Sequence, residues 1–249
     1  MTNSFIRIGR FILRSQIRTA FVVFIAVLTS VIILSARFYG REDFIEGILI
    51  EAHGMLLDIL VIGILILWLN EKREESFRNE RYQDEIDDFR GWQSEEAMYR
   101  IRGNIKRLNA NGVTNINLYN CYMKNVKLAG VNLSEASLQG SDVGNGYFVG
   151  AILKRARFEG AYMGDVNLRG ANLRGANLER ARCQRANLRG VDFRDASLVR
   201  AQFWEADLHG ANCRGADLRD ANFRDANLRS VDFIGSKNNV KSASLRRKV

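Results

Sequence analysis

Few side chains in this 249-residue sequence could carry chemistry. The two histidines, His53 and His209, lie far apart, and the three cysteines, Cys121, Cys183 and Cys213, form no CxxC pair. The sequence contains no metal-ligand cluster, no phosphate-binding loop of the Gly-rich type and no nucleophile–base pair. An odd number of cysteines indicates a reducing compartment rather than a disulfide scaffold. We therefore predict no enzyme, no cofactor and no metal site.

Two acidic residues interrupt an apolar run near the amino terminus. Glu51 and Asp58 are seven residues apart and share one face of a helix expected over residues 50–70. An acid within a membrane is a candidate for ion movement or helix pairing, which makes an ion channel or sensor one alternative function. The other interpretation is that both carboxylates lie at headgroup depth.

The same region predicts a transmembrane hairpin, with helices at about 19–38 and 50–70. Residues 19–36 carry no charge and do not end in the Ala-x-Ala of a cleaved signal peptide. Basic residues precede the first span and follow the second, which places both termini in the cytoplasm. The basic segment 1–18 predicts a surface helix on anionic lipid, or alternatively an organelle transit peptide. We expect a multi-pass protein of the inner (cytoplasmic) membrane.

A charged helical neck is predicted over residues 71–112. Ser94 is a candidate N-cap for its second helix. That helix carries an apolar stripe at 3-4-3 spacing, which either joins two copies of the chain or lies over the open end of the following domain. The stripe consists of Met98, Ile101, Ile105 and Leu108.

The rest of the chain is a five-residue repeat. From Leu118 to Phe233 every fifth residue is apolar, at 24 positions without a skip. Two residues earlier, 15 of the 24 positions hold Ala and five hold Val, commonly with Asn or Asp in between. One large and one small apolar residue per five can be buried only by stacking repeats on one another.

This A-(N/D)-L-x-x pattern over residues 113–236 resembles the pentapeptide-repeat family. The resemblance implies a β-solenoid, namely a right-handed quadrilateral β-helix with four repeats per coil and about six coils. A basic tail, 237–249, follows it. The column of glycines from Gly130 to Gly210, one every 20 residues, is typical of a turn that requires positive φ.

Twenty residues per coil would align two basic columns on the outside of the rod. Acids such as Asp192, Asp195 and Asp207 would relieve part of the repulsion between like charges. The columns are either a solvated mixed-charge face or a docking stripe for an acidic protein surface, phosphate groups or lipid headgroups. Few aromatic residues lie between them, which disfavours nucleic acid. The columns are Lys154, Arg174, Arg194 and Arg214, and Arg169, Arg189, His209 and Arg229.

Three apolar residues are also expected to point outward, Tyr147, Val149 and Ile152. They form either the seat of the preceding helix or a site for a partner.

Taken together, the sequence predicts a membrane-anchored, non-enzymatic scaffold that presents a rigid cytoplasmic rod to an unidentified protein. Anionic lipids are expected partners, and a homo-oligomer would form through the neck or the transmembrane helices. The resemblance also suggests a second alternative, because some family members imitate duplex DNA and protect topoisomerases. Those members look strongly acidic, whereas this chain has a net charge of +9.

Overall fold

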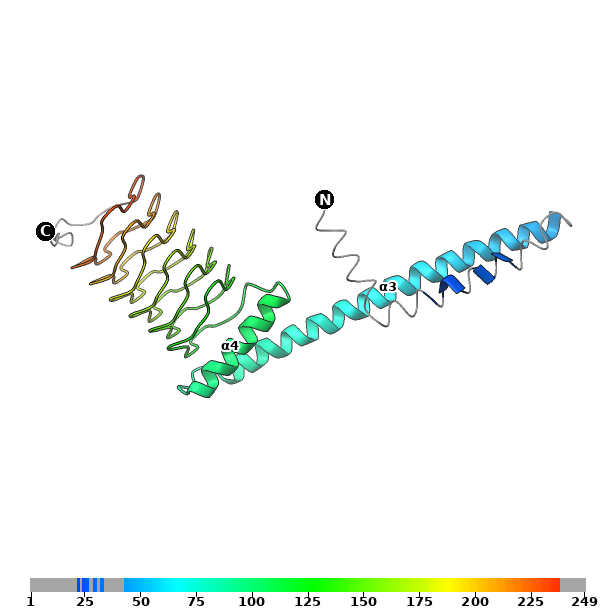
Figure 1. The fold of residues 1–249 in the computed structure, drawn as a ribbon, viewed down its shortest axis with the longest axis horizontal. Coiled ribbons are helices and arrows are strands. Elements are labelled where there is room, and N and C mark those ends of the chain that lie inside the picture. The colour runs from blue at the N-terminus through cyan, green and yellow to red at the C-terminus, as the bar shows by residue number, and fades with distance from the viewer. Residues whose placement is uncertain (1–21, 23, 27–28, 31, 34–42, 238–249) are drawn as a thin grey trace. The chain divides into compact units, whose positions relative to one another are not determined.

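The computed structural model divides the chain into two units, Met1–Phe77 and Arg78–Val249 (Figure 1). Helix α3 runs over Asp43–Asp88 and so contributes to both units, whereas helix α4, Glu95–Ala110, belongs to the second. The predicted segment 1–18, most of the first predicted span and nearly all of the basic tail lie outside the described residues. The described residues are 22, 24–26, 29–30, 32–33 and 43–237.

In the first unit, the part of α3 between residues 55 and 69 exposes large apolar side chains. Ile59 is 65% exposed and Trp68 is 44% exposed. Asp58 is exposed as well, whereas the side chain of Glu51 lies outside the described part. Among the residues that the structure describes, no helix has both the length and the apolar character needed to cross a membrane. The transmembrane hairpin predicted over 19–38 and 50–70 is not found there.

The second unit contains a rod of stacked coils (Figure 1). Parallel β-bridges join every fifth residue to the residue 20 positions later, from Asn117↔Ser137 to Asp217↔Lys237. Four pentapeptides therefore make one coil, and residues 117–236 make six coils, about 29 Å of rod at ~4.8 Å per coil. Each bridge is a single residue long because a turn follows every bridge, so these ladders replace extended strands.

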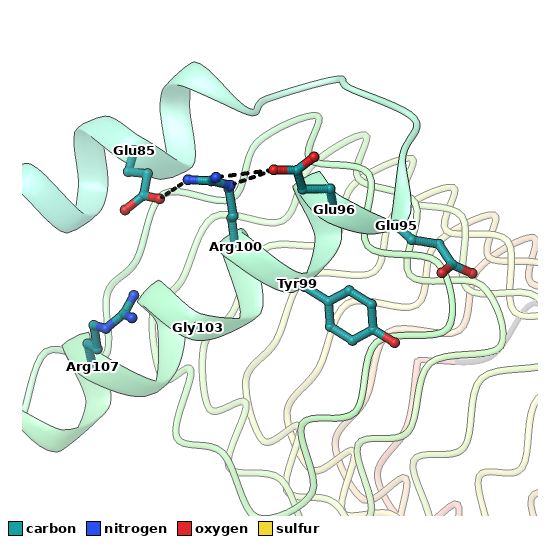
Figure 2. A pocket seen from close by; sticks show the side chains of 7 residues that line it. All are labelled: Glu85, Glu95, Glu96, Tyr99, Arg100, Gly103 and Arg107. Atoms are coloured by element: carbon teal, nitrogen blue, oxygen red, sulfur yellow. Dashed lines mark hydrogen bonds and ion pairs between the residues drawn. The ribbon is translucent and has the colours of Figure 1, made fainter.

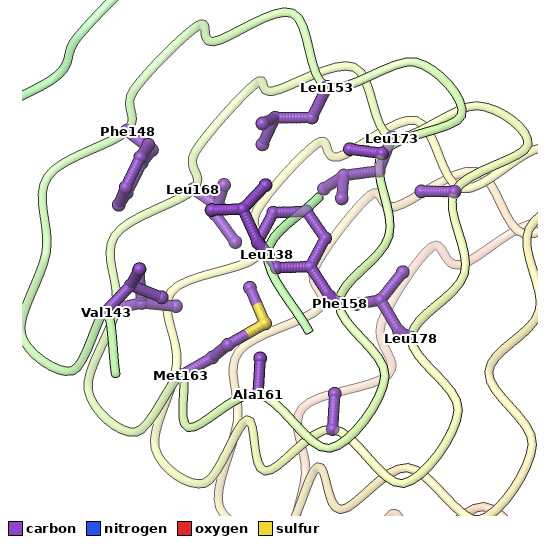
Figure 3. Close-up of a cluster of buried hydrophobic side chains, with 14 of the residues drawn as sticks. Leu138, Val143, Phe148, Leu153, Phe158, Ala161, Met163, Leu168, Leu173 and Leu178 are labelled. Atoms are coloured by element: carbon purple, nitrogen blue, oxygen red, sulfur yellow. The ribbon is translucent and has the colours of Figure 1, made fainter. Parts of the chain in front are cut away.

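The apolar repeat positions fill the inside of the rod (Figure 3). From Leu118 to Phe223, the residue at every fifth position is at most 2% exposed. Phe148 and Phe158 are among the largest of these side chains. Burying one such side chain stabilises the fold by about 1.5–3 kcal/mol, so the repeat supplies the main driving force for folding.

A turn with a left-handed residue closes every pentapeptide. Leu118 C=O accepts a hydrogen bond from Cys121 N–H at 3.2 Å, and the equivalent bond recurs along the rod. The second residue after each inward apolar side chain has φ between 52° and 70°, from Asn120 to Gly235. Positive φ at this position defines a type II turn. The prediction for the glycine column is confirmed, and the other three corners of each coil adopt the same conformation.

Where a repeat has Asn or Asp before its inward apolar side chain, that Asn or Asp satisfies a backbone donor that the coils leave unpaired. Between residues 137 and 216, four N–H groups of each pentapeptide bond within the turn or to a neighbouring coil. The residue after the inward apolar side chain donates to no backbone carbonyl among the described residues. In repeats with Asn or Asp, its N–H donates to that side chain two residues earlier, as from Arg174 N–H to Asn172 Oδ1 at 3.1 Å. Such local bonds favour Asn and Asp in turns.

The amino-terminal edge of the rod is covered by α4 and the last turns of α3. Ser94 caps α4 by accepting a bond from Ala97 N–H at 3.1 Å. The apolar stripe of this helix, from Met98 to Leu108, is buried in the same continuous core as the coils. Helix α4, the second helix of the predicted neck, thus lies over the open end of the rod.

Two side-chain amides take the place of a coil that would precede the first one. Asn109 Nδ2 donates to Asn132 C=O at 2.7 Å, and Asn132 N–H donates to Asn109 Oδ1 at 2.8 Å. Gln83 makes the same pair of bonds with Asn117, at 2.9 and 3.1 Å. Each amide therefore pairs with the donor and the acceptor that an open sheet edge would expose.

Candidate interaction surface

The charges of the rod are distributed unequally around its axis. We define the basic side as the two ladders that begin at Lys127 and Asn132, each with the turns that follow it. The balanced side comprises the ladders that begin at Asn117 and Tyr122. Over residues 113–236 the basic side holds nine Lys/Arg and five Asp/Glu, and the balanced side holds eight of each. The entire net charge of +4 in the rod therefore lies on the basic side.

Both predicted arginine columns lie on the basic side, and four of their members are paired with acids. The three acids expected to relieve repulsion, Asp192, Asp195 and Asp207, all take part. The ion pairs are Arg194–Asp192 at 2.7 Å, Arg189–Asp207 at 3.1 Å, Arg174–Asp195 at 3.2 Å and Arg214–Asp232 at 3.6 Å.

Two of these pairs favour the charged form of their acids, Asp192 and Asp207. The hydrogen bond from Arg194 lowers the pKa of Asp192 below its usual 3.8. Burial raises the pKa of Asp207, but bonds from the His209 backbone N–H and from Arg189 outweigh it and leave a net lowering. Arginine remains charged throughout the physiological range, so the mixture of signs on this side is fixed.

Three members of the columns, Lys154, Arg169 and Arg229, are exposed. Within the part of the chain that the structure describes, none of the three has an ion pair. Their charges are therefore available to a partner without the loss of an internal contact.

The predicted apolar patch lies on the basic side and is uncovered. Tyr147 is 45% exposed, Ile152 is 38% exposed and Val149 is half-buried. Helix α4 contacts the preceding coil instead, where Arg102 Nε donates to Lys127 C=O at 2.9 Å. The three residues are therefore not the seat of the helix, which was one of the two interpretations of the sequence.

The other candidate groups form no reactive centre in the described chain. Burial raises the pKa of the Cys121 thiol to about 11 and those of Cys183 and Cys213 to about 12. A thiol with such a pKa supplies almost no thiolate at neutral pH. Among the described residues, no group of three His, Cys, Asp or Glu side chains could hold a metal ion.

A groove of about 620 Å³ between the end of α3 and α4 was not expected from the sequence (Figure 2). Arg100 crosses it, bonding Glu96 at 3.1 Å and Glu85 at 3.4 Å, with its guanidinium 5.1 Å from the centroid of the Phe89 ring. The four-residue spacing of Glu96 and Arg100 was the only signal in the sequence. The other arginine that lines the groove, Arg107, donates to Asn104 Oδ1 at 2.7 Å, so both arginines of the groove already have partners.

The family model for pentapeptide repeats matches the chain in 8 copies, over residues 116–155, 151–195 and 196–235. No curated protein matches the chain.

Solved structures that resemble it include a pentapeptide-repeat protein from the Arabidopsis thaliana thylakoid lumen. That protein is 28% identical, with a TM-score of 0.31, and the match covers 39% of this chain and 61% of the other, less than two thirds of its length.

Trypsin-treated QnrB1, a plasmid-mediated fluoroquinolone resistance protein, is 20% identical, with a TM-score of 0.33, covering 50% of this chain and 73% of the other. HetL of Nostoc sp. strain PCC 7120, involved in heterocyst differentiation regulation, is 21% identical, with a TM-score of 0.24, covering 54% and 93%. The matched repeats and their 20-residue register show that residues 116–235 belong to the pentapeptide-repeat family.

Proposed function

We propose that this protein is a non-enzymatic scaffold that presents the outside of its rod to a protein partner. The observation that carries the proposal is the fixed position of the outward side chains. Each coil is hydrogen-bonded to the next, so outward residues are held in columns at ~4.8 Å spacing. A repeat rod of this kind supplies an extended binding surface rather than a closed cavity.

We also propose that the scaffold is attached to the cytoplasmic membrane, with both termini in the cytoplasm and anionic lipid at the basic flanks. The proposal draws on the apolar runs in the sequence and on their charged flanks. It is supported by the exposed apolar side chains of α3, such as Ile62 and Leu65, because exposed apolar surface of this kind marks a contact with lipid or with another protein.

Imitation of duplex DNA fits the rod poorly. A mimic of the phosphate backbone needs a surface dominated by negative charge. Here one side of the rod is neutral and the other is basic. We therefore do not extend the resistance function of QnrB1 to this chain.

Carbonate extraction of bacterial membranes that contain the full chain tests the attachment. We expect the natural protein to stay in the membrane pellet and Leu65→Arg to shift to the supernatant, because a charge in hydrocarbon is costly. The matched control, Glu80→Lys, changes an exposed residue later in α3 and should remain in the pellet. Release of the natural protein by carbonate would rule out the attachment.

Site-specific photocrosslinking in the same membranes tests the scaffold role. A photoreactive residue at position 169 on the basic side should give discrete crosslinked species, and the scaffold role requires such species from at least one side of the rod. Position 182 on the balanced side is the matched comparison. The absence of crosslinks from every outward position would refute the scaffold role.

A further inference from the structure

We infer that the basic side is a docking face for an acidic protein segment that carries an apolar anchor at one end. The segment lies along the rod axis, with its anchor on Tyr147 and Ile152 and its carboxylates over the arginine columns. The inference rests on the proposed scaffold function and specifies the chemistry of the partner.

Charge and apolar surface coincide on one side of the rod. Tyr147 and Ile152 bridge directly to Asn167 and Asn172, each of which is two residues before a column arginine. The apolar patch therefore lies one coil before Arg169 and Arg174. A partner that contacts the patch and continues along the axis meets the columns next.

The docking face is short enough for one helical segment to reach both of its ends. The coil that holds Tyr147 and the coil that holds Arg229 are four steps apart, about 19 Å at ~4.8 Å per step. A helix of about 13 residues covers that distance at 1.5 Å per residue. A short acidic segment is therefore long enough to contact the anchor patch and the last free arginine together.

The mixture of charges on this face favours a protein partner over a lipid surface or a nucleic acid. Asp195 is 59% exposed beside Arg174, so the docking face shows negative charge between its arginines. A uniform layer of phosphates would be repelled at such positions, whereas a protein segment can place either sign where it is needed. Phosphate also has no contact to offer to Tyr147 and Ile152, whereas an apolar anchor does.

The ion pairs on the rod determine where the charge of a partner acts. Arg174, Arg189, Arg194 and Arg214 already have carboxylate partners on the rod. Lys154, Arg169 and Arg229 have no ion pair in the described part of the chain. Carboxylates of a partner gain most at these three positions. Lys154 and Arg169 lie near the apolar patch, and Arg229 lies at the far end.

The test measures fluorescence anisotropy with the full chain in a neutral detergent. The probe is a labelled 16-residue peptide with glutamates at i, i+4 spacing and two adjacent leucines at one end. A second peptide replaces the leucines with serine, and a third replaces the glutamates with lysine. We expect the first peptide (the Leu-Glu peptide) to bind most tightly, the second (the Ser-Glu peptide) to bind more weakly and the lysine peptide not to bind. The affinity of both acidic peptides should fall as salt is raised.

Two sets of variants locate the site. Arg169→Glu combined with Arg229→Glu should weaken the Leu-Glu peptide by about tenfold, since each exposed charge contributes modestly. The matched control, Arg182→Glu with Arg224→Glu on the balanced side, should change binding by less than about twofold. Tyr147→Ser with Ile152→Ser should weaken the Leu-Glu peptide to the level of the Ser-Glu peptide.

Several outcomes would overturn the docking face. One is an equal loss of peptide binding from the two charge-reversal pairs. Another is an equal effect of Tyr147→Ser with Ile152→Ser on both acidic peptides. A third is that Arg169→Glu with Arg229→Glu weakens binding to phosphatidylserine vesicles or to duplex DNA more than binding to the Leu-Glu peptide. Leu65→Arg should leave peptide binding unchanged, which separates docking from membrane attachment. Crosslinks from position 182 without peptide binding at the basic side would refute the docking face and leave the scaffold role standing.

Discussion

Replacing Asn109 by alanine should destabilise the first coil without touching the repeat itself. The substitution removes the side chain that pairs with both the N–H and the C=O of Asn132, at 2.8 and 2.7 Å. Both backbone groups are part-buried, and an orphaned group of this kind costs about 1 kcal/mol or more. A third bond, from Asn109 Nδ2 to Val113 C=O at 3.1 Å, is lost as well. We expect the free energy of unfolding to fall by about 2–3 kcal/mol.

Urea unfolding followed by circular dichroism measures the loss, and amide hydrogen exchange places it. The amide of Asn132 should exchange faster, whereas amides near Leu188, three coils away, should keep their protection unless the whole rod unfolds. Gln83→Ala should cost less, about 0.5–1 kcal/mol, because Asn117 is exposed and water can replace the amide. Lys106→Ala, on the exposed surface of α4, is the matched control. A loss below 0.5 kcal/mol for Asn109→Ala would show that the paired amide does not stabilise the edge.

Three further predictions concern the coils. Leu188→Ala should lower the free energy of unfolding by about 2–5 kcal/mol in urea titrations, because Leu188 is fully buried. Gly190→Ala should cost about 1 kcal/mol in the same assay, since φ is 63° there while no atom lies within 4 Å of the added Cβ. The lowered pKa of Asp192 stabilises the fold above its usual 3.8, and this contribution is lost as pH falls through the folded-state pKa. Arg194→Ala should therefore lower the urea midpoint at pH 7 more than at pH 2.

The rod was predictable because the residues that form each coil follow a local pattern in the sequence. The apolar side chain at each fifth position, the small residue two positions earlier and the Asn or Asp between them all act within one pentapeptide or between stacked copies. The columns followed from the register alone, so the pairing of Arg174 with Asp195 could be expected from their spacing of 21 residues. Only the generality of the turn was missed, because Gly marks positive φ in sequence and Arg, Asp or Glu does not.

The paired amides at the edge could not be predicted, because nothing near Asn109 in the sequence indicates its partner. Asn132 is 23 residues away and Asn117 is 34 residues from Gln83. Neither amide belongs to a motif, and each acquires its role only once the helix packs on the coil. The sequence also does not determine whether Tyr147 is covered, because a shift of α4 by one coil along the rod would decide the exposure of Tyr147.

Each corner of the rod has two outward side chains, one at the left-handed turn position and one at the position before it. Charged residues at these two positions have different roles. Where a charged residue occupies the left-handed position, its neighbour 20 residues away frequently has the opposite charge, as in Asp165–Arg185 at 2.7 Å and Glu135–Arg155 at 3.2 Å. Exposed pairs of this kind contribute about 0–1 kcal/mol, which offsets part of the ~1 kcal/mol that a left-handed residue costs.

The turn residue directly before the left-handed one has ordinary backbone geometry. An ion pair at this position therefore has no backbone cost to offset. On the basic side, the positions before the left-handed residues hold Lys154 and the arginines of both columns. Their excess of positive charge has no structural reason. The net charge of the rod therefore results from the residues that its fold constrains least, which is where selection for a partner can act without loss of stability.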